Sequence, residues 1–113
     1  MKLTRVYSGS DGQSHFGEFE LPVEDKPGVG PQSISLKATE VFYRENKGGH
    51  ESDWHRATQK QFVVLLEGEL EVEVGDGSKH RFTAGDIFLC EDATGQGHKV
   101  RGRNRKTVVV RLA

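Results

Sequence analysis

The sequence predicts an all-β fold, a single small antiparallel barrel or sandwich, and three observations support this prediction. About eight to ten short apolar stretches, separated by turn residues, follow one another at the spacing of strands in such folds. No segment repeats apolar residues at helical spacing over three turns, so we expect no helix. At 113 residues the chain is long enough for one core without stabilising disulfides or metals, and we expect one domain over residues 1–113.

The N-terminal half predicts strands divided by a long loop. Lys2 to Ser8 is a short mixed segment that we expect to form an edge strand. Gly17 to Val23 alternates apolar and acidic residues, and the proline near its end places it at an edge or ends it. Residues 24–32 hold two prolines and two glycines and predict a loop. Ser33 to Asn46 predicts a strand pair or one bent strand, and a glycine-led loop should follow over residues 47–53.

The centre of the chain predicts a buried hairpin. Phe62 to Leu66 is the longest uncharged apolar run, too short for a membrane span and suited to a buried strand. Glu67-Gly68 then breaks the run, and Glu69 to Val74 alternates acids with apolar residues, which predicts a two-residue turn between two strands. In that register Gln61 shares the inner face with Val63, Leu65, Leu70, Val72 and Val74.

The next hairpin has two candidate registers. A three-residue loop over residues 76–78 would place His80 and Phe82 on the inner face. A two-residue loop would place Lys79 and Arg81 there instead. Because apolar side chains suit the inner face better, the sequence favours the first register.

The C-terminal third predicts the last strands of the domain. Ile87 to Cys90 forms a short strand, and residues 91–97 form a polar loop. His98 to Gly102 and Thr107 to Leu112 predict two closing strands. The basic cluster at residues 101–106 is then expected to be a solvated turn between them.

Composition limits the partners and the compartment. Sixteen Lys and Arg against 17 Asp and Glu give a net charge of −1, so neither nucleic acid nor an anionic membrane is an expected partner. Cys90 is the single cysteine, which excludes an internal disulfide and suits a small buried hydrophobe. No N-terminal stretch resembles a signal peptide, and we expect a reducing, cytoplasmic location.

Two stretches resemble the paired motifs of the cupin superfamily, which are small barrels of the jelly-roll kind. Residues 48–68 follow its first motif, with two glycines, a histidine and a hydrophobic strand that ends in glycine. Residues 85–98 follow its second motif, with a Gly-Asp pair, a strand and a closing histidine. The positions that bind metal in the family are occupied here by His55, Ala57, Gln61 and His98. This resemblance implies a jelly roll with its site inside the barrel.

The candidate site residues follow from these motif positions. His55, Gln61 and His98 are the candidate metal ligands, and Asp53 or Asp92 could supply the missing anionic ligand. The cofactor is then a divalent transition metal, with iron, manganese, zinc and nickel not distinguished; the alternative is no cofactor. His98 and Asp92 are the candidate acid–base pair. Trp54, beside His55, and Gln61 are the candidate substrate-binding residues.

Two functions remain open at this stage. The domain either binds a small molecule inside the barrel, or it is a metal-dependent enzyme of isomerase, lyase or dioxygenase type acting on a small polar substrate. A homodimer is also expected. Strand alternation points Phe62, Val64 and Leu66 outward, and either a second protomer or N-terminal strands carrying Phe16 and Phe19 should cover them.

Overall fold

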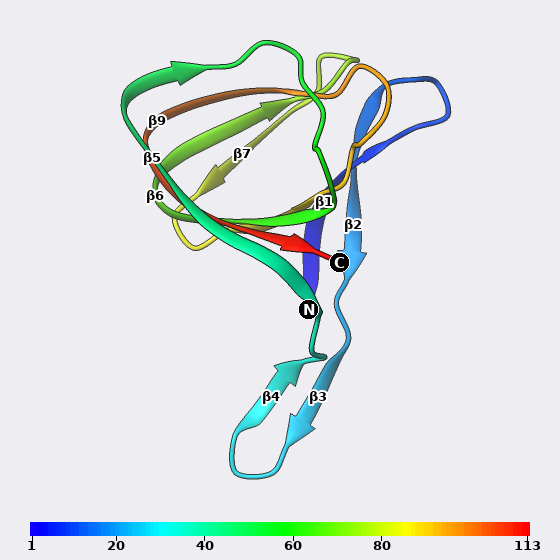
Figure 1. The fold of residues 1–113 in the computed structure, drawn as a ribbon, viewed down its shortest axis with the longest axis vertical. Coiled ribbons are helices and arrows are strands. Elements are labelled where there is room, and N and C mark those ends of the chain that lie inside the picture. The colour runs from blue at the N-terminus through cyan, green and yellow to red at the C-terminus, as the bar shows by residue number, and fades with distance from the viewer.

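The computed structural model describes all of residues 1–113 and shows an all-β jelly roll without a helix (Figure 1). With no helix present, no helical segment long and apolar enough to cross a membrane exists. The nine strands are β1 (Lys2–Ser8), β2 (Ser14–Glu20), β3 (Val23–Lys26), β4 (Gly30–Ser33), β5 (Ala38–Glu51), β6 (Gln61–Glu73), β7 (Lys79–Thr83), β8 (Ile87–Cys90) and β9 (Lys99–Leu112).

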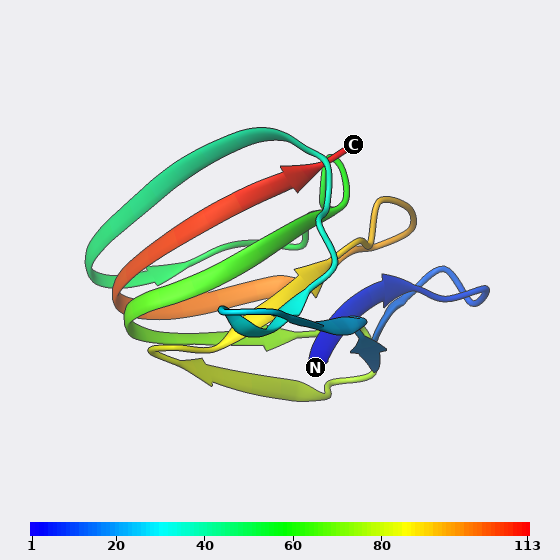
Figure 2. The ribbon, with the colours of Figure 1, turned by 90° about the horizontal axis from the view of Figure 1, so that it is seen from below.

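Seven strands form one curved sheet in the order β2-β1-β8-β6-β9-β5, with β7 beside the second half of β6. All pairs are antiparallel except β1 with β8. Strands β5, β6 and β9 are the longest, and they lie side by side and bend together (Figures 1 and 2). The first half of β6 pairs with β8 and its second half pairs with β7, so the bend folds the sheet over on itself.

The bend replaces the hairpin that the sequence predicted at Glu67-Gly68, so that prediction was wrong. Strand β6 is continuous, and Gly68 has a positive φ of 79°. A Cβ at Gly68 would lie 2.3 Å from the carbonyl oxygen of Asn104, so only glycine fits there. Asn104 on β9 is also left-handed, with φ 50°, and register shifts surround Glu67. These bulges let both strands turn the corner.

The inner face nevertheless carries the predicted side chains. Leu65, Val72 and Val109 are fully buried in a core that also contains Val63, Leu70, Val74, Phe82 and Phe88. A bulge shifts the alternation of a strand by one residue, as a two-residue turn does, so both arms of β6 still point their apolar residues inward. The hairpin between β6 and β7 has the favoured register, with Val72 opposite His80.

Four further predictions need correction. Residues 24–32 were expected to be a loop, but most of this segment forms the β3–β4 hairpin, which projects from the body of the molecule (Figure 1). The expected glycine loop over residues 47–53 is largely the end of β5. The expected turn at residues 101–106 lies inside β9, because the backbone bulge keeps this basic segment in the sheet. Strand β1 pairs on both sides and is not an edge.

Residues 61–66 form the first arm of β6, before the bend, and the outer face of this arm is partly covered by other residues of the same chain. Phe19 on β2 packs against Phe62 with ring centroids 6.5 Å apart. Phe16, the other residue expected there, instead packs against the core and near His80. Leu66 remains 44% exposed. Residues of the same chain therefore cover Phe62, but the neighbouring apolar surface at Leu66 stays exposed.

Candidate functional site

Two histidines are brought together where the loop after β5 meets the start of β9. His55 N donates to the His98 carbonyl oxygen at 3.0 Å, and His98 N donates to the His55 carbonyl oxygen at 2.8 Å. The approach is close because Gly97, with φ 82°, has no side chain: a Cβ there would lie 1.9 Å from the His55 carbonyl oxygen. The two imidazole rings lie side by side, with centroids 4.5 Å apart.

His98 is held by a buried carboxylate. Its Nδ1 lies 2.6 Å from Asp92 Oδ2, and the two side chains are 5% and 0% exposed. Ser14 donates to the same oxygen at 2.6 Å, and Cys90 Sγ donates to the other oxygen at 3.3 Å. Burial raises the pKa of Asp92, but the hydrogen bond and charge of His98, with the bonds from Ser14 and Cys90, outweigh it and leave the pKa below its ordinary value.

The tautomer of His98 follows from this contact. An ionised carboxylate can only accept hydrogen bonds, so Nδ1 carries the proton. In the neutral ring Nε2 therefore keeps a lone pair. His55 is anchored in the same way, because its Nδ1 lies 2.9 Å from the Asp53 carbonyl oxygen, with Ser52 Oγ at 3.3 Å. Both histidines thus have Nδ1 engaged and Nε2 available for a ligand.

Gln61 contributes a buried oxygen without a partner. Its side chain is 9% exposed, and its Oε1 has no hydrogen bond. Gln61 pairs in register with Cys90, whose Sγ reaches Asp92, so the amide lies on the inner face beside this network. An unsatisfied buried acceptor costs about 1–3 kcal/mol. A bound donor or cation at Oε1 would remove that cost.

The hollow nearest to these residues has a volume of about 720 Å³. Trp54 and His55 line it together with Arg56, Ala57, Thr58, Ala93, Gly95 and Gln96. Trp54 is half-buried, and Lys99 Nζ lies 4.8 Å from its ring centroid. His98, Asp92 and Gln61 are buried and do not line this hollow. The structure therefore places Trp54 and His55 at the surface of the candidate site.

The donor atoms of Cys90, Asp92 and His98 lie within 4.8 Å of one another, which is close enough for a shared metal ion. These atoms already hydrogen-bond to one another. Burial, followed by the charge of Asp92, raises the pKa of Cys90 well above its usual value and keeps the thiol protonated, which makes it a poor ligand. We therefore interpret this cluster as the hydrogen-bonded support of His98. Of the predicted metal ligands, Gln61 Oε1 has no hydrogen bond, and the two imidazoles are bonded through Nδ1.

Sequence reasoning predicted Asp92 but missed two members of this network, Ser14 and Cys90. Ser14 and Asp92 are separated by 78 positions, and no local pattern signals their contact. Cys90 was expected to be only a small buried hydrophobe; it is buried, and it also donates to Asp92. Glu91, which precedes Asp92 in the chain, forms an ion pair with Arg5.

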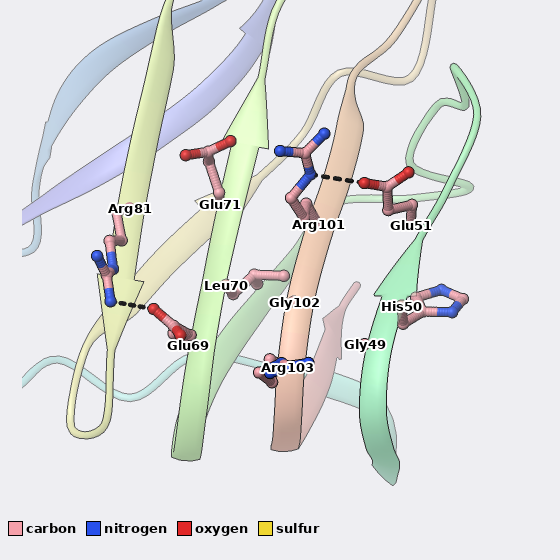
Figure 3. Close-up of a pocket in the computed structure, with 10 residues that line it drawn as sticks. All are labelled: Gly49, His50, Glu51, Glu69, Leu70, Glu71, Arg81, Arg101, Gly102 and Arg103. Atoms are coloured by element: carbon pink, nitrogen blue, oxygen red, sulfur yellow. Dashed lines mark hydrogen bonds and ion pairs between the residues drawn. The ribbon is translucent and has the colours of Figure 1, made fainter.

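A second hollow, of about 520 Å³, lies on the outer face of β7, β6, β9 and β5 (Figure 3). Its walls carry rows of opposite charge. Arg81 pairs with Glu69, and Arg101 pairs with Glu51 at 2.8 Å. Cross-strand pairing therefore satisfies most of these charges within the sheet.

Comparison with known proteins shows which families and structures this chain resembles. The sequence profile of the cupin domain matches residues 41–112. A 49-residue stretch is 41% identical to oryzines biosynthesis cluster protein J of Aspergillus oryzae, and it makes up 43% of this chain but only 27% of that protein. An RmlC-like cupin from Shewanella frigidimarina superposes with a TM-score of 0.51 at 19% identity, covering 97% of this chain and 85% of that one. A sugar phosphate isomerase from the cupin superfamily of Silicibacter pomeroyi gives 0.51 at 21%, covering 100% and 71%. At identities this low, the likeness to these two structures shows a shared fold and nothing more.

Proposed function

This chain belongs to the cupin domain family, and on that premise we propose that it binds a small polar organic molecule in the hollow beside Trp54 and His55. The observation that supports the proposal is the Asp92–His98 contact of 2.6 Å, buried directly behind His55. This carboxylate, whose pKa is held below its ordinary value, fixes the orientation of the His98 ring. Buried pairs of this kind are typical of sites that use a histidine as an acid or a base.

The chemistry that this pair supports is proton transfer. For this pair to act, a hydroxyl group or an acidic C–H of the ligand has to pass the wall of the hollow beside His55 and reach the buried His98 Nε2. His98 Nε2 then accepts the proton, which leaves the ligand as its conjugate base. The resulting imidazolium is stabilised by Asp92, and His98 then returns the proton to the ligand. Trp54 would pack against the apolar part of the molecule, and Arg56 would contact an anionic group. A domain that only binds its ligand would use the same contacts without the proton transfer.

A ligand screen tests this function. The panel contains hydroxylated and carboxylated metabolites, together with sugar phosphates because one structural neighbour is a sugar phosphate isomerase. Binding should shift the NMR signals of the Trp54 indole and the His55 ring, and His98→Ala should weaken it. His15→Gln is the matched control, because His15 lies elsewhere and bonds to the exposed Asp11. A ligand that binds His98→Ala as tightly as the wild type would contradict the proposal.

The second candidate function is a metal-dependent one. It is favoured by Gln61 Oε1, which is buried and unpaired, and by the two imidazoles whose Nδ1 atoms are anchored. The ring centroids are 4.5 Å apart, so both imidazoles would lie close to such an ion. When bound, such an ion would polarise a ligand oxygen as a Lewis acid. All three donors are neutral, so we expect the ion to be held weakly.

A further inference from the structure

The bend of β9 buries a guanidinium group that has no carboxylate partner. Arg105 is 6% exposed, and its only side-chain hydrogen bond runs from Nη2 to Asn46 Oδ1 at 2.9 Å. Its Nε has no partner. Arg105 takes part in none of the ion pairs of the chain. Buried charges are normally paired, because their desolvation is costly.

The inward position of Arg105 is set by the backbone of the bend. Arg103 and Arg105 are two residues apart and would share one face of a regular strand. Asn104 between them is left-handed, with φ 50°, and its side chain accepts a hydrogen bond from Gly48 N at 2.9 Å. As a result Arg103 is exposed on the outer face (Figure 3), whereas Arg105 is buried with Thr107 on the inner face.

The hollow beside Arg105 contains a second arginine, and neither arginine has an ion-pair partner. A hollow of about 390 Å³ is lined by Arg44, Glu45, Asn46, His50 and Arg105. Arg44 and Asn46 pair in register with the buried Thr107 and Arg105, so this row of β5 faces inward. Glu45 also lines the hollow, but it forms no ion pair with either arginine.

Burial, followed by the positive charge of Arg44, lowers the pKa of Arg105 from its usual value. Both effects oppose the protonated guanidinium. Arginine nevertheless stays charged in proteins because its intrinsic pKa is so high. A bound anion would supply the counter-charge that the chain does not.

We propose that this hollow is a phosphate-binding site in which Arg105 and Arg44 hold the oxyanion. A guanidinium presents a planar set of N–H donors that matches phosphate oxygens, and the only hydrogen bond of the Arg105 guanidinium is from Nη2 to Asn46. The Asn46 amide and His50 border the same hollow and can add donors. The ligand is inorganic phosphate or the phosphate group of a small phosphomonoester. The site lies at the bend, away from His55 and His98, and does not depend on the proposed function.

Unfolding by urea tests the site, since guanidinium chloride would compete for the anion. At phosphate concentrations ten times the dissociation constant, the unfolding constant of the wild type should fall by about elevenfold relative to chloride at equal ionic strength. Arg105→Met should abolish this stabilisation, and Arg44→Gln should weaken it. Arg103→Met is the matched control, because Arg103 lies on the same strand but on the outer face, and it should respond as the wild type does. Comparing phosphate with glycerol phosphate identifies the source, since the preferred ligand stabilises at the lower concentration.

Two results would overturn the site. One is an equal response to phosphate and chloride in the wild type; the other is an undiminished phosphate response in Arg105→Met. Should Arg105→Met fail to fold, the exposed Arg44→Gln variant and ³¹P NMR of phosphate with folded protein decide the question, and unchanged ³¹P signals would reject it. His98→Ala should bind phosphate as the wild type does, so the failure of one proposal can be distinguished from the failure of the other.

Discussion

Replacing Asp92 with Asn should destabilise the protein and change the tautomer of His98. Asp92 accepts two bonds of 2.6 Å, from Ser14 Oγ and from His98 Nδ1. Bonds to a charged acceptor contribute about 1.5–3 kcal/mol and neutral ones about 0.5–1.5, so the substitution should cost about 1 kcal/mol per bond and about 2 kcal/mol in total. The Asn amide would also donate to Nδ1, which moves the ring proton to Nε2 and removes the proposed base.

The stabilising contribution of Asp92 should depend on pH, and the direction of its pKa shift gives the direction of this dependence. Because the folded-state pKa of Asp92 is lowered, its stabilising contribution is present at neutral pH and is lost as the pH falls below the ordinary value of 3.8 toward the folded-state pKa. The difference between wild type and Asp92→Asn should therefore shrink in acid. Urea unfolding at several pH values measures it, and ¹⁵N NMR of the ring reports the tautomer. Asp53→Asn, an exposed control in the same region, should change stability by less than about 1 kcal/mol. A deficit that persists unchanged in acid, or a His98 tautomer that does not move, would refute the reasoning.

Three further outcomes are expected. Any divalent metal should be lost on dialysis at mildly acidic pH, because protonation removes His55 and His98 as ligands. Calorimetry should show tighter metal binding by Gln61→Glu, which adds a negative charge. Metal that resists a chelator would argue against a weak site. Gly97→Ala should cost more than about 1 kcal/mol in urea unfolding and separate the two histidine rings by NMR, since its φ of 82° and the contact with the His55 carbonyl leave no room for Cβ. We also propose a homodimer through the exposed apolar face of the first arm: sedimentation should show dissociation for Val64→Lys, and a concentration-independent monomer in the wild type would remove the dimer.

The alternation of the sequence was sufficient to predict the inner face but not the path of the chain. Gln61, Val63 and Leu65 have the opposite parity to Leu70 and Val72, so the pattern must shift by one residue between them. A tight turn and a β-bulge both produce that shift. What separates them is pairing along the whole of β6 with β9, a contact between segments far apart in the sequence. Local turn chemistry at Gly68 therefore suited either path.

The site was predictable where it rested on a motif position and unpredictable where it rested on tertiary contact. His55 and His98 were placed at motif positions, and the structure puts their rings side by side. Ser14 is an ordinary serine in sequence and acquires its role only because β1 and β2 pack beside the loop that carries Asp92. Arg105 was assigned to a solvated basic turn, and it is buried because Asn104 inverts the direction of its side chain. A sequence does not show a single left-handed asparagine.

The length of β9 explains why the two proposed sites should act independently. His98 immediately precedes this strand, and Arg105 lies seven residues later at the bend, which is about 20 Å along an extended strand. Figure 1 shows β9 running from the loop end to the bend and then returning. The fully buried core residues Leu65, Val72 and Val109 lie inside the same folded sheet and belong to neither site. Substitutions more than about 7–10 Å apart without shared partners add in their effect on stability. The effects of substitutions at Asp92 and at Arg105 on the free energy of unfolding should therefore add. A ligand bound at one site should also leave the other unchanged, because the packed apolar core between them has no mobile polar network.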